Sequence, residues 1–167
     1  MSTVLLICGL PGAGKTTLAK RIERERPALR LTEDEWVAGL FGDGDVHDDA
    51  MREAIKEVQW ETAVRALRLG VDVVLDWGLW ALSERDDFRA RAAALGVRAE
   101  LVFLDVPLAE LSRRLAARNA ALPPATYRVT DADLSAYARV FEPPTPEEVA
   151  AFSVVSGSRV AGIGNLP

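Results

Sequence analysis

The sequence predicts a three-layer α/β/α domain with a parallel sheet of about five strands, and two observations support this prediction. Short apolar runs alternate along the chain with longer amphipathic segments, a pattern typical of strands joined by crossover helices. The first apolar run leads directly into a glycine-rich loop at residues 9–17, which is followed by a helical pattern. Because parallel strands end at one edge of their sheet, we expect the functional site at that edge.

Composition narrows the class of protein. A chain of 167 residues suits a single domain over residues 1–167. No apolar run reaches the roughly 18 residues of a membrane span, and the first one lacks the basic flank of a signal peptide. The single Cys8 excludes an internal disulfide, and we expect a cytoplasmic protein. The net charge of −5 disfavours a nucleic-acid partner.

The individual elements follow from apolar periodicity, proline and glycine positions, and helix-start residues. We expect Thr32 to cap the second helix, with Glu35 as its capping-box partner. A lid is expected at about residues 113–130, and a flexible tail at about 162–167. The predicted strands are 3–8, 28–32, 71–76 and 99–106, with a possible fifth within 154–161. The predicted helices are 14–26, 33–41, 50–69, 83–95, 107–120, 130–141 and 147–152.

The glycine-rich loop satisfies the P-loop pattern Gly-x-x-x-x-Gly-Lys-[Ser/Thr]. Its residues are Gly9, Leu10, Pro11, Gly12, Ala13, Gly14, Lys15, Thr16 and Thr17. The glycines let phosphate oxygens approach backbone N–H groups, and the following helix adds its positive dipole end. Lys15 is predicted to reach the β- and γ-phosphates of a nucleoside triphosphate, and Thr16 to bind Mg²⁺.

Carboxylates at strand ends are candidates for the chemistry. Asp34 follows the second predicted strand, where it could accept the proton of an attacking hydroxyl or merely complement a helix dipole. Asp76 ends the third predicted strand, where it could hold Mg²⁺ through water or only terminate the strand. Asp105 follows the fourth strand and is a weaker candidate.

Several cations and aromatic residues are candidate ligands. Arg114 and Arg118 are one helical turn apart and could converge on one anion as part of the lid, although a solvated helix face is the alternative. Arg52 and Arg85 could hold a substrate, or form ordinary ion pairs with nearby acids.

The substrate candidates among the aromatic residues are Trp36, Trp77 and Trp80, with core positions as the alternative. His47 lacks companion ligands for zinc, and we interpret it as a surface loop residue.

Four segments resemble the small P-loop kinases, a group that contains zeta toxins, chloramphenicol phosphotransferase and the kinase domain of polynucleotide kinases. They are 9–17, Leu31–Trp36, Val73–Trp80 with Glu84-Arg85, and Arg114–Asn119. The chain is most similar to bacterial kinase-like proteins labelled AAA family ATPases, over residues 3–148. The resemblance implies that Asp34 is a general base, that Lys15 and Thr16 bind phosphate and Mg²⁺, and that Arg114 and Arg118 are lid arginines. The acceptor-binding signatures of zeta toxins and of chloramphenicol phosphotransferase are absent from this sequence.

The sequence therefore predicts an ATP- and Mg²⁺-dependent kinase that acts on a hydroxyl of a small molecule such as a nucleoside, an antibiotic or a sugar. A polynucleotide or RNA 5′-hydroxyl kinase is the first alternative. A module that binds ATP without transferring phosphate is the second. Neither the acceptor nor the oligomeric state follows from the sequence.

Overall fold

A computed structural model describes residues 2–42, 48–123, 126–151 and 155–156. Its centre is a parallel sheet in the order β2-β3-β1-β4-β5. The strands are β1 Thr3–Cys8, β2 Ala28–Thr32, β3 Asp72–Gly78, β4 Arg98–Phe103 and β5 Val155–Ser156. Four strands form the body of the sheet, and the two-residue β5 extends it beside β4. The predicted α/β fold with a parallel sheet is therefore confirmed.

Helices connect the strands in the predicted alternation. They are α1 Lys15–Glu25, α2 Glu33–Phe41, α3 Asp49–Arg68, α4 Leu82–Ala94, α5 Leu108–Ala121, α6 Asp131–Val140 and α7 Pro146–Ala151. Each begins and ends within a few residues of the expected position, because proline, glycine and polar caps mark the boundaries. The predicted tail at 162–167 lies outside the described residues.

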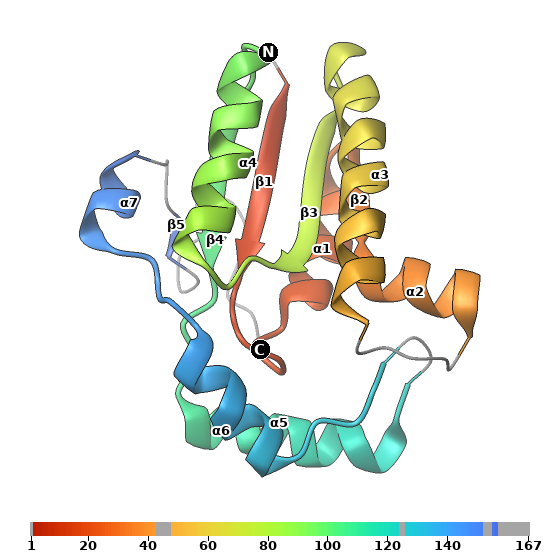
Figure 1. Ribbon diagram of the computed structural model, residues 1–167, viewed down its shortest axis with the longest axis vertical. Helices are drawn as coiled ribbons and strands as arrows, with labels where there is room; N and C mark the ends of the chain where they lie inside the picture. The colour runs from red at the N-terminus through yellow and green to blue at the C-terminus, as the bar shows by residue number, and fades with distance from the viewer. Residues whose placement is uncertain (1, 43–47, 124–125, 152–154, 157–167) are drawn as a thin grey trace.

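Two apolar clusters pack on opposite faces of the sheet. One joins alternate residues of β1 and β3 to α3 and α4, and the other joins the intervening residues to α1, α5 and α6. Leu6 and Leu75, which pair in register, belong to the first cluster, whereas Leu5 and Ile7 belong to the second. In Figure 1, α3 and α4 lie in front of the sheet and α1 lies behind it, while α5 and α6 cross below the strand ends. The site therefore has a floor formed by strand ends and a wall formed by α5 and α6.

Two local predictions need correction. Thr32 is the N-cap residue of α2, but its side chain makes no capping bond. Its hydroxyl instead accepts a bond from Arg30 and donates to Asp76 Oδ2 at 3.4 Å, and Arg30 also engages Glu35. The capping box is absent because both of its members are used in this network. In addition, β3 continues through Gly78, so Asp76 lies within the strand and not at its last residue.

Length and hydropathy do not allow any helix within the described ranges to cross a membrane.

Candidate active site

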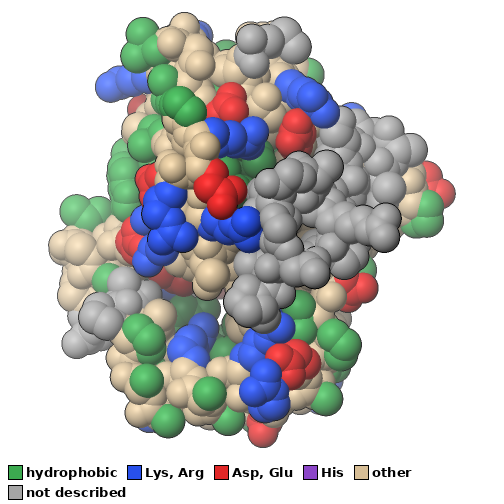
Figure 2. Space-filling view, turned by 180° about the vertical axis from the view of Figure 1, so that it is seen from behind, with side chains coloured by type: hydrophobic (Ala, Val, Ile, Leu, Met, Phe, Trp, Pro, Cys, Tyr) green, Lys and Arg blue, Asp and Glu red, His purple; other side chains and the backbone are tan. Residues whose placement is uncertain are grey.

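The site is a cleft of about 680 Å³ at the carboxyl ends of β1, β2 and β3. The P-loop and α1 form one end, the starts of α2, α3 and α4 form the other, and residues of α5, α6 and the segment after α5 line the side. Figure 2, seen from behind, shows a hollow between the body of the molecule and its lower layer, with Lys and Arg side chains gathered around it. The sheet edge that the sequence predicted is thus where the cavity lies.

The P-loop has the geometry of an anion site. Gly12 and Gly14 adopt φ values of 83° and 98°, in the left-handed region that favours glycine. A Cβ at Gly12 would lie 3.0 Å from Leu115 Cγ, whereas one at Gly14 would meet nothing within 4 Å. Helix α1 begins directly after Gly14, with no side-chain cap and no acidic residue in its first turn. Its first N–H groups are left for a ligand, and an anion suits them.

Lys15 lies at the start of α1, and its Nζ donates to the carbonyl oxygen of Leu10 at 3.0 Å. Burial lowers the pKa of Lys15, while the nearby charges of Asp76 and Asp34 act in the opposite direction. Both carboxylates are therefore close enough to interact with the ammonium. The ammonium group of Lys15 can therefore bind the phosphate oxygens of a ligand that enters the cleft.

Asp76 lies beside the P-loop because β3 is the neighbour of β1 in the sheet. It is buried, and this burial raises its pKa, although a hydrogen bond from Thr16 and the charge of Lys15 oppose the shift. The hydroxyl of Thr32, at the end of β2, donates to it from the other side. Asp76 and Thr16 together present carboxylate and hydroxyl oxygens, the donor type that Mg²⁺ prefers.

Asp34 lies across the cleft in the first turn of α2, with a half-exposed side chain. Arg52 of α3 donates from Nη1 and Nη2 to Asp34 Oδ1, both at 3.1 Å, and also binds the buried carboxylate of Glu33. The Arg52 guanidinium lies 5.9 Å from the ring centroid of Tyr127. Burial, reinforced by the charge of Asp34, raises the pKa of Tyr127 to about 12. One arginine thus fixes Asp34 against the segment that follows α5.

Two arginines of α5, Arg114 and Arg118, line the cleft. Arg114 Nε donates to Glu110 one turn earlier at 2.7 Å, and Arg118 Nη2 donates to the carbonyl oxygen of Tyr127 at 3.1 Å. The Nε of Arg118 is buried without a hydrogen-bond partner among the described residues. The predicted lid therefore includes the C-terminal half of α5 and the chain around Tyr127; residues 124–125 lie outside the described part.

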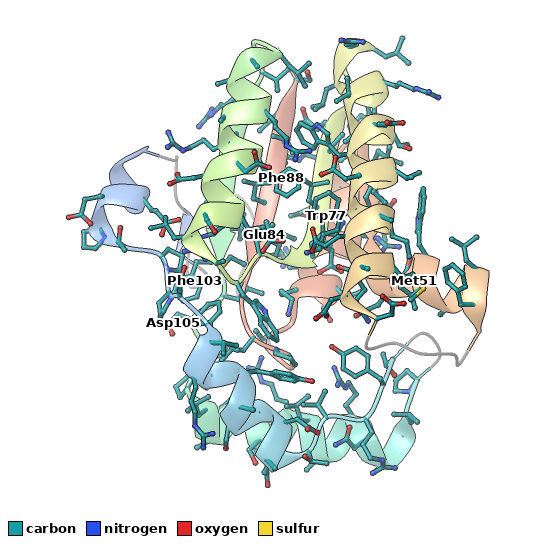
Figure 3. All side chains as sticks on the ribbon, viewed as in Figure 1. Met51, Trp77, Glu84, Phe88, Phe103 and Asp105 are labelled. Carbon is teal, nitrogen blue, oxygen red and sulfur yellow. The ribbon has the colours of Figure 1, made fainter. Side chains whose placement is uncertain are left out.

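Two tryptophans that follow Asp76 line the cleft with their indole N–H groups already engaged. Trp77 Nε1 donates to Gln59 Oε1 at 2.5 Å, and Trp80 Nε1 donates to the carbonyl oxygen of Gly9 at 3.3 Å. Figure 3 shows Trp77 beside Phe88 of α4, and their ring centroids are 5.0 Å apart. Trp77 is thus both a core residue and a wall of the cleft, a combination that the sequence left open.

Several predicted site residues lie elsewhere. Arg85 is completely buried, donates to Glu148 and to the carbonyl oxygens of Leu79 and Trp80, and does not line the cleft. Of the two predictions for Arg85, the ion pair is therefore the one observed, and the substrate contact is wrong. Trp36 packs against the core cluster under α3 and α4 and is likewise not a lining residue. Asp105 lies on the far side of the molecule from Met51 and the start of α3 (Figure 3) and does not reach the cleft. His47 lies outside the described residues.

The structure also adds residues that sequence reasoning missed. Glu33 is buried in contact with Arg52, and this burial raises its pKa. Lys56 donates to Glu84 at 2.7 Å across the cleft mouth, between α3 and α4. One signal was available for Lys56, because it follows Arg52 by one helical turn and lies on the same face of α3. No local pattern pointed to Glu33, because its partner is 19 residues away.

Together, the glycine-rich loop, the sheet order and the cleft define a P-loop domain. A family model described as an AAA domain matches residues 4–144, and the chain belongs to that family. None of the curated proteins matches the chain significantly.

Solved structures share the fold at low sequence identity. A gluconokinase from Sinorhizobium meliloti 1021 matches with a TM-score of 0.62 and 19% identity, over 93% of this chain and 80% of that chain. Kti12 from Chaetomium thermophilum, in complex with ADP-AlF3, matches with a TM-score of 0.68 and 14% identity, over 92% and 87%. A chain of the Pnkp1/Rnl/Hen1 RNA repair complex matches with a TM-score of 0.71 and 18% identity, over 90% of this chain and 46% of that one. The chain therefore spans less than half of that relative, and it has the fold of P-loop kinases.

Proposed function

We propose that this protein is an ATP- and Mg²⁺-dependent phosphotransferase that moves the γ-phosphate to a hydroxyl group of a small molecule. One observation carries the proposal. Asp34 lines the same cleft as the P-loop, and its charge acts on the ammonium group of Lys15. A carboxylate that shares a cleft with a phosphate-binding loop is placed to accept the proton of a hydroxyl group bound between them.

The nucleotide end of the cleft supplies positive charge and N–H donors. In the proposed complex, the backbone amides of residues 12–16 and the ammonium of Lys15 hold the phosphates. Arg114 and Arg118 approach from α5 and neutralise charge that develops on the transferred group. The bond from Arg114 to Glu110 holds this arginine near the cleft before any ligand enters. Phosphoryl transfer depends largely on such positioning and charge neutralisation.

The oxygen atoms of Thr16 and Asp76 fit a Mg²⁺ ion. Thr16 would bind it directly and Asp76 through water, and their mutual hydrogen bond keeps the two side chains together. When bound with the nucleotide, Mg²⁺ neutralises charge on the phosphate oxygens. Thr32 restrains Asp76 from the opposite side.

At the other end of the cleft, Asp34 orients the acceptor hydroxyl and takes its proton. The acceptor oxygen forms a bond to the γ-phosphorus as the bond from that phosphorus to the leaving oxygen of ADP breaks. Arg52 donates twice to Oδ1 of Asp34, and Oδ2 is the oxygen that we propose receives the proton. Trp77, Trp80 and Arg52 are the proposed walls of the acceptor site, in agreement with their place in the cleft lining.

The test uses γ-labelled ATP with Mg²⁺ and pools of nucleosides, sugars, nucleotide sugars, phenicol and aminoglycoside antibiotics, and a 5′-hydroxyl oligonucleotide. Label should move to one pool of small molecules. Asp34→Asn should abolish most of this transfer while ATP affinity stays close to that of the wild type. Lys15→Ala should weaken ATP binding itself. Wild-type turnover in Asp34→Asn would remove Asp34 from the mechanism, and unchanged ATP affinity in Lys15→Ala would contradict the P-loop assignment.

The same experiment separates the two alternatives. Label on the oligonucleotide, together with a steep salt dependence of its binding, would indicate a polynucleotide kinase. Slow release of free phosphate that is equal in the wild type and in Asp34→Asn would indicate a nucleotide-binding module without an acceptor.

A further inference from the structure

The two ends of the cleft carry opposite charge. The cations Lys15, Lys20, Arg114 and Arg118 lie at the end formed by the P-loop, α1 and α5, with Asp76 as the carboxylate there. At the other end, the lining residues described by the structure include two cations, Arg52 and Lys56. The carboxylates at that end are Glu33, Asp34, Glu35, Asp49 and Glu84. Acidic groups thus outnumber basic ones where the acceptor would lie, and the nucleotide end has the opposite balance.

Both cations of the acceptor end already hold carboxylates. Arg52 binds Glu33 and Asp34, and Lys56 binds Glu84 and Glu53 at 2.7 and 3.0 Å. The side chains of Arg52 and Lys56 are largely shielded, with exposures of 18% and 13%. An anionic acceptor that took Arg52 would leave the buried Glu33 without its partner, and an uncompensated buried charge is strongly unfavourable. The cations at this end therefore balance protein carboxylates and do not serve as receptors for an anion.

Two aromatic side chains also line the acceptor end. Trp77 and Tyr127 line it, and the indole N–H of Trp77 is satisfied by Gln59. Trp77 is only 9% exposed and packs against Phe88, so a small part of its indole reaches the cleft, and Tyr127 is the other aromatic contact available to a ring compound. A compact ring with several hydroxyl groups can place its polar edges against the carboxylates and its face against the aromatic residues.

From this charge segregation we propose that the phosphate acceptor is an amine-bearing or uncharged hydroxyl compound, without phosphate or carboxylate groups, and that an amine is preferred. This inference rests on the proposed phosphotransferase function and names the acceptor class for the same site. An ammonium group on the acceptor would replace water beside Glu84 or Asp49, whereas a carboxylate or phosphate would meet net negative charge.

The experiment compares acceptors that share a ring system and differ in the charged group that they carry. One triad is glucosamine, glucose and glucuronate; the other is 3′-amino-3′-deoxyadenosine, adenosine and adenosine 3′-phosphate. In γ-label transfer, kcat/KM should be highest for the amine, and lower by about tenfold or more for the anion. Glu84→Gln removes one negative charge from the cleft lining and leaves Lys56 with Glu53 as its remaining partner, so it should shift the anion-to-amine ratio by about tenfold toward the anion. Glu61→Gln, an exposed change on α3 outside the cleft, should leave the ratio unchanged.

The outcomes separate this inference from the proposed function. If kcat/KM for an anionic acceptor equals or exceeds that for the matching amine, the proposed acceptor class is wrong, although the phosphotransferase proposal stands. If no member is labelled, the phosphotransferase proposal loses its support, and binding decides the acceptor class. Saturation-transfer NMR with a non-hydrolysable ATP analogue would then have to detect the amine and not the anion. Detection of the anion, or of neither compound, would overturn the proposal.

Discussion

Glu148→Gln is expected to lower the free energy of unfolding by about 3–5 kcal/mol, because it removes one partner of a buried ion pair. Glu148 lies on α7, and its two carboxylate oxygens accept bonds from Arg85 Nε and Nη2 at 2.7 and 2.9 Å. Arg85 is 0% exposed and Glu148 is 4% exposed. A pair at the surface would contribute only about 0–1 kcal/mol, so the depth of this pair sets the magnitude.

The geometry explains why glutamine cannot substitute. Its single amide oxygen can accept from one Arg85 nitrogen, and its NH2 group would face the other donor. Arg85 cannot turn away, because its Nη1 donates to the carbonyl oxygens of Leu79 and Trp80 at 2.9 and 3.0 Å. Replacing both partners, as in Arg85→Met with Glu148→Leu, should cost less than the two single changes added together, because no lone charge stays buried.

Urea unfolding followed by tryptophan fluorescence measures the change, and the m-value reports whether the transition remains two-state. If α7 detaches locally instead, the global transition will move less, but limited proteolysis will cut within residues 142–151. Glu147→Gln, on the exposed neighbour, is the matched control and should alter neither measurement. A loss below about 1 kcal/mol together with unchanged protease resistance would refute the reasoning, because the pair would then behave like a surface contact.

Three further predictions concern the glycine loop, a buried amide and the single thiol. Gly12→Ala should lower the free energy of unfolding in urea by about 2–3 kcal/mol, because the strain at positive φ is joined by a clash with α5. Gly70→Ala has a similar φ and no neighbour within 4 Å, and it should cost about 1 kcal/mol. Equal losses in the two variants would exclude the clash. Gln59→Leu leaves the indole N–H of Trp77 unpaired and should lower stability by about 1–3 kcal/mol in the same assay, and an unchanged midpoint would contradict this. Burial raises the pKa of Cys8 from 9.0 to about 12, so the unfolded thiol ionises first and stability falls as pH rises above 9. Between pH 8 and 10 the wild type should lose about 1.4 kcal/mol more than Cys8→Ala, and parallel pH profiles of the two proteins would show that the thiol is not protected.

Local patterns were sufficient for the elements and for the nucleotide end of the site. The glycine loop, the strand before it and the helix after it are consecutive in the chain, so spacing alone predicted their geometry. Asp34 and Asp76 follow short apolar runs, and the rule that parallel strands end at one edge placed both near the P-loop. The structure brings these residues to one cleft, although their chemical roles stay proposals.

The acceptor end was harder to predict because its contacts join distant parts of the chain. Arg52 meets Glu33 across 19 residues, and Lys56 meets Glu84 across 28. A sequence shows that a charged residue exists, but the packing of helices decides which opposite charge it meets. For the same reason the sequence could not decide between a substrate contact and an ion pair for Arg85, because its partner lies 63 residues further along the chain.

The turn between β3 and α4 connects the nucleotide loop to the segment that follows the predicted lid. Its Gly78 carbonyl oxygen accepts from the N–H of Gly9 at 3.1 Å, and its Trp80 indole donates to the Gly9 carbonyl oxygen. From the other side, the N–H of Glu142 donates to the Trp80 carbonyl oxygen at 3.0 Å, and Arg85 binds the same oxygen. The segment after α6 and the P-loop thus hold one short turn between them, and the buried Arg85 fixes its carbonyl groups. Two consecutive hydrogen bonds, from Glu142 to Trp80 and from Trp80 to Gly9, therefore connect the segment after α6 to the first glycine of the P-loop. Because Arg85 and Glu148 hold this turn in place, their ion pair supports the P-loop without lining the cleft.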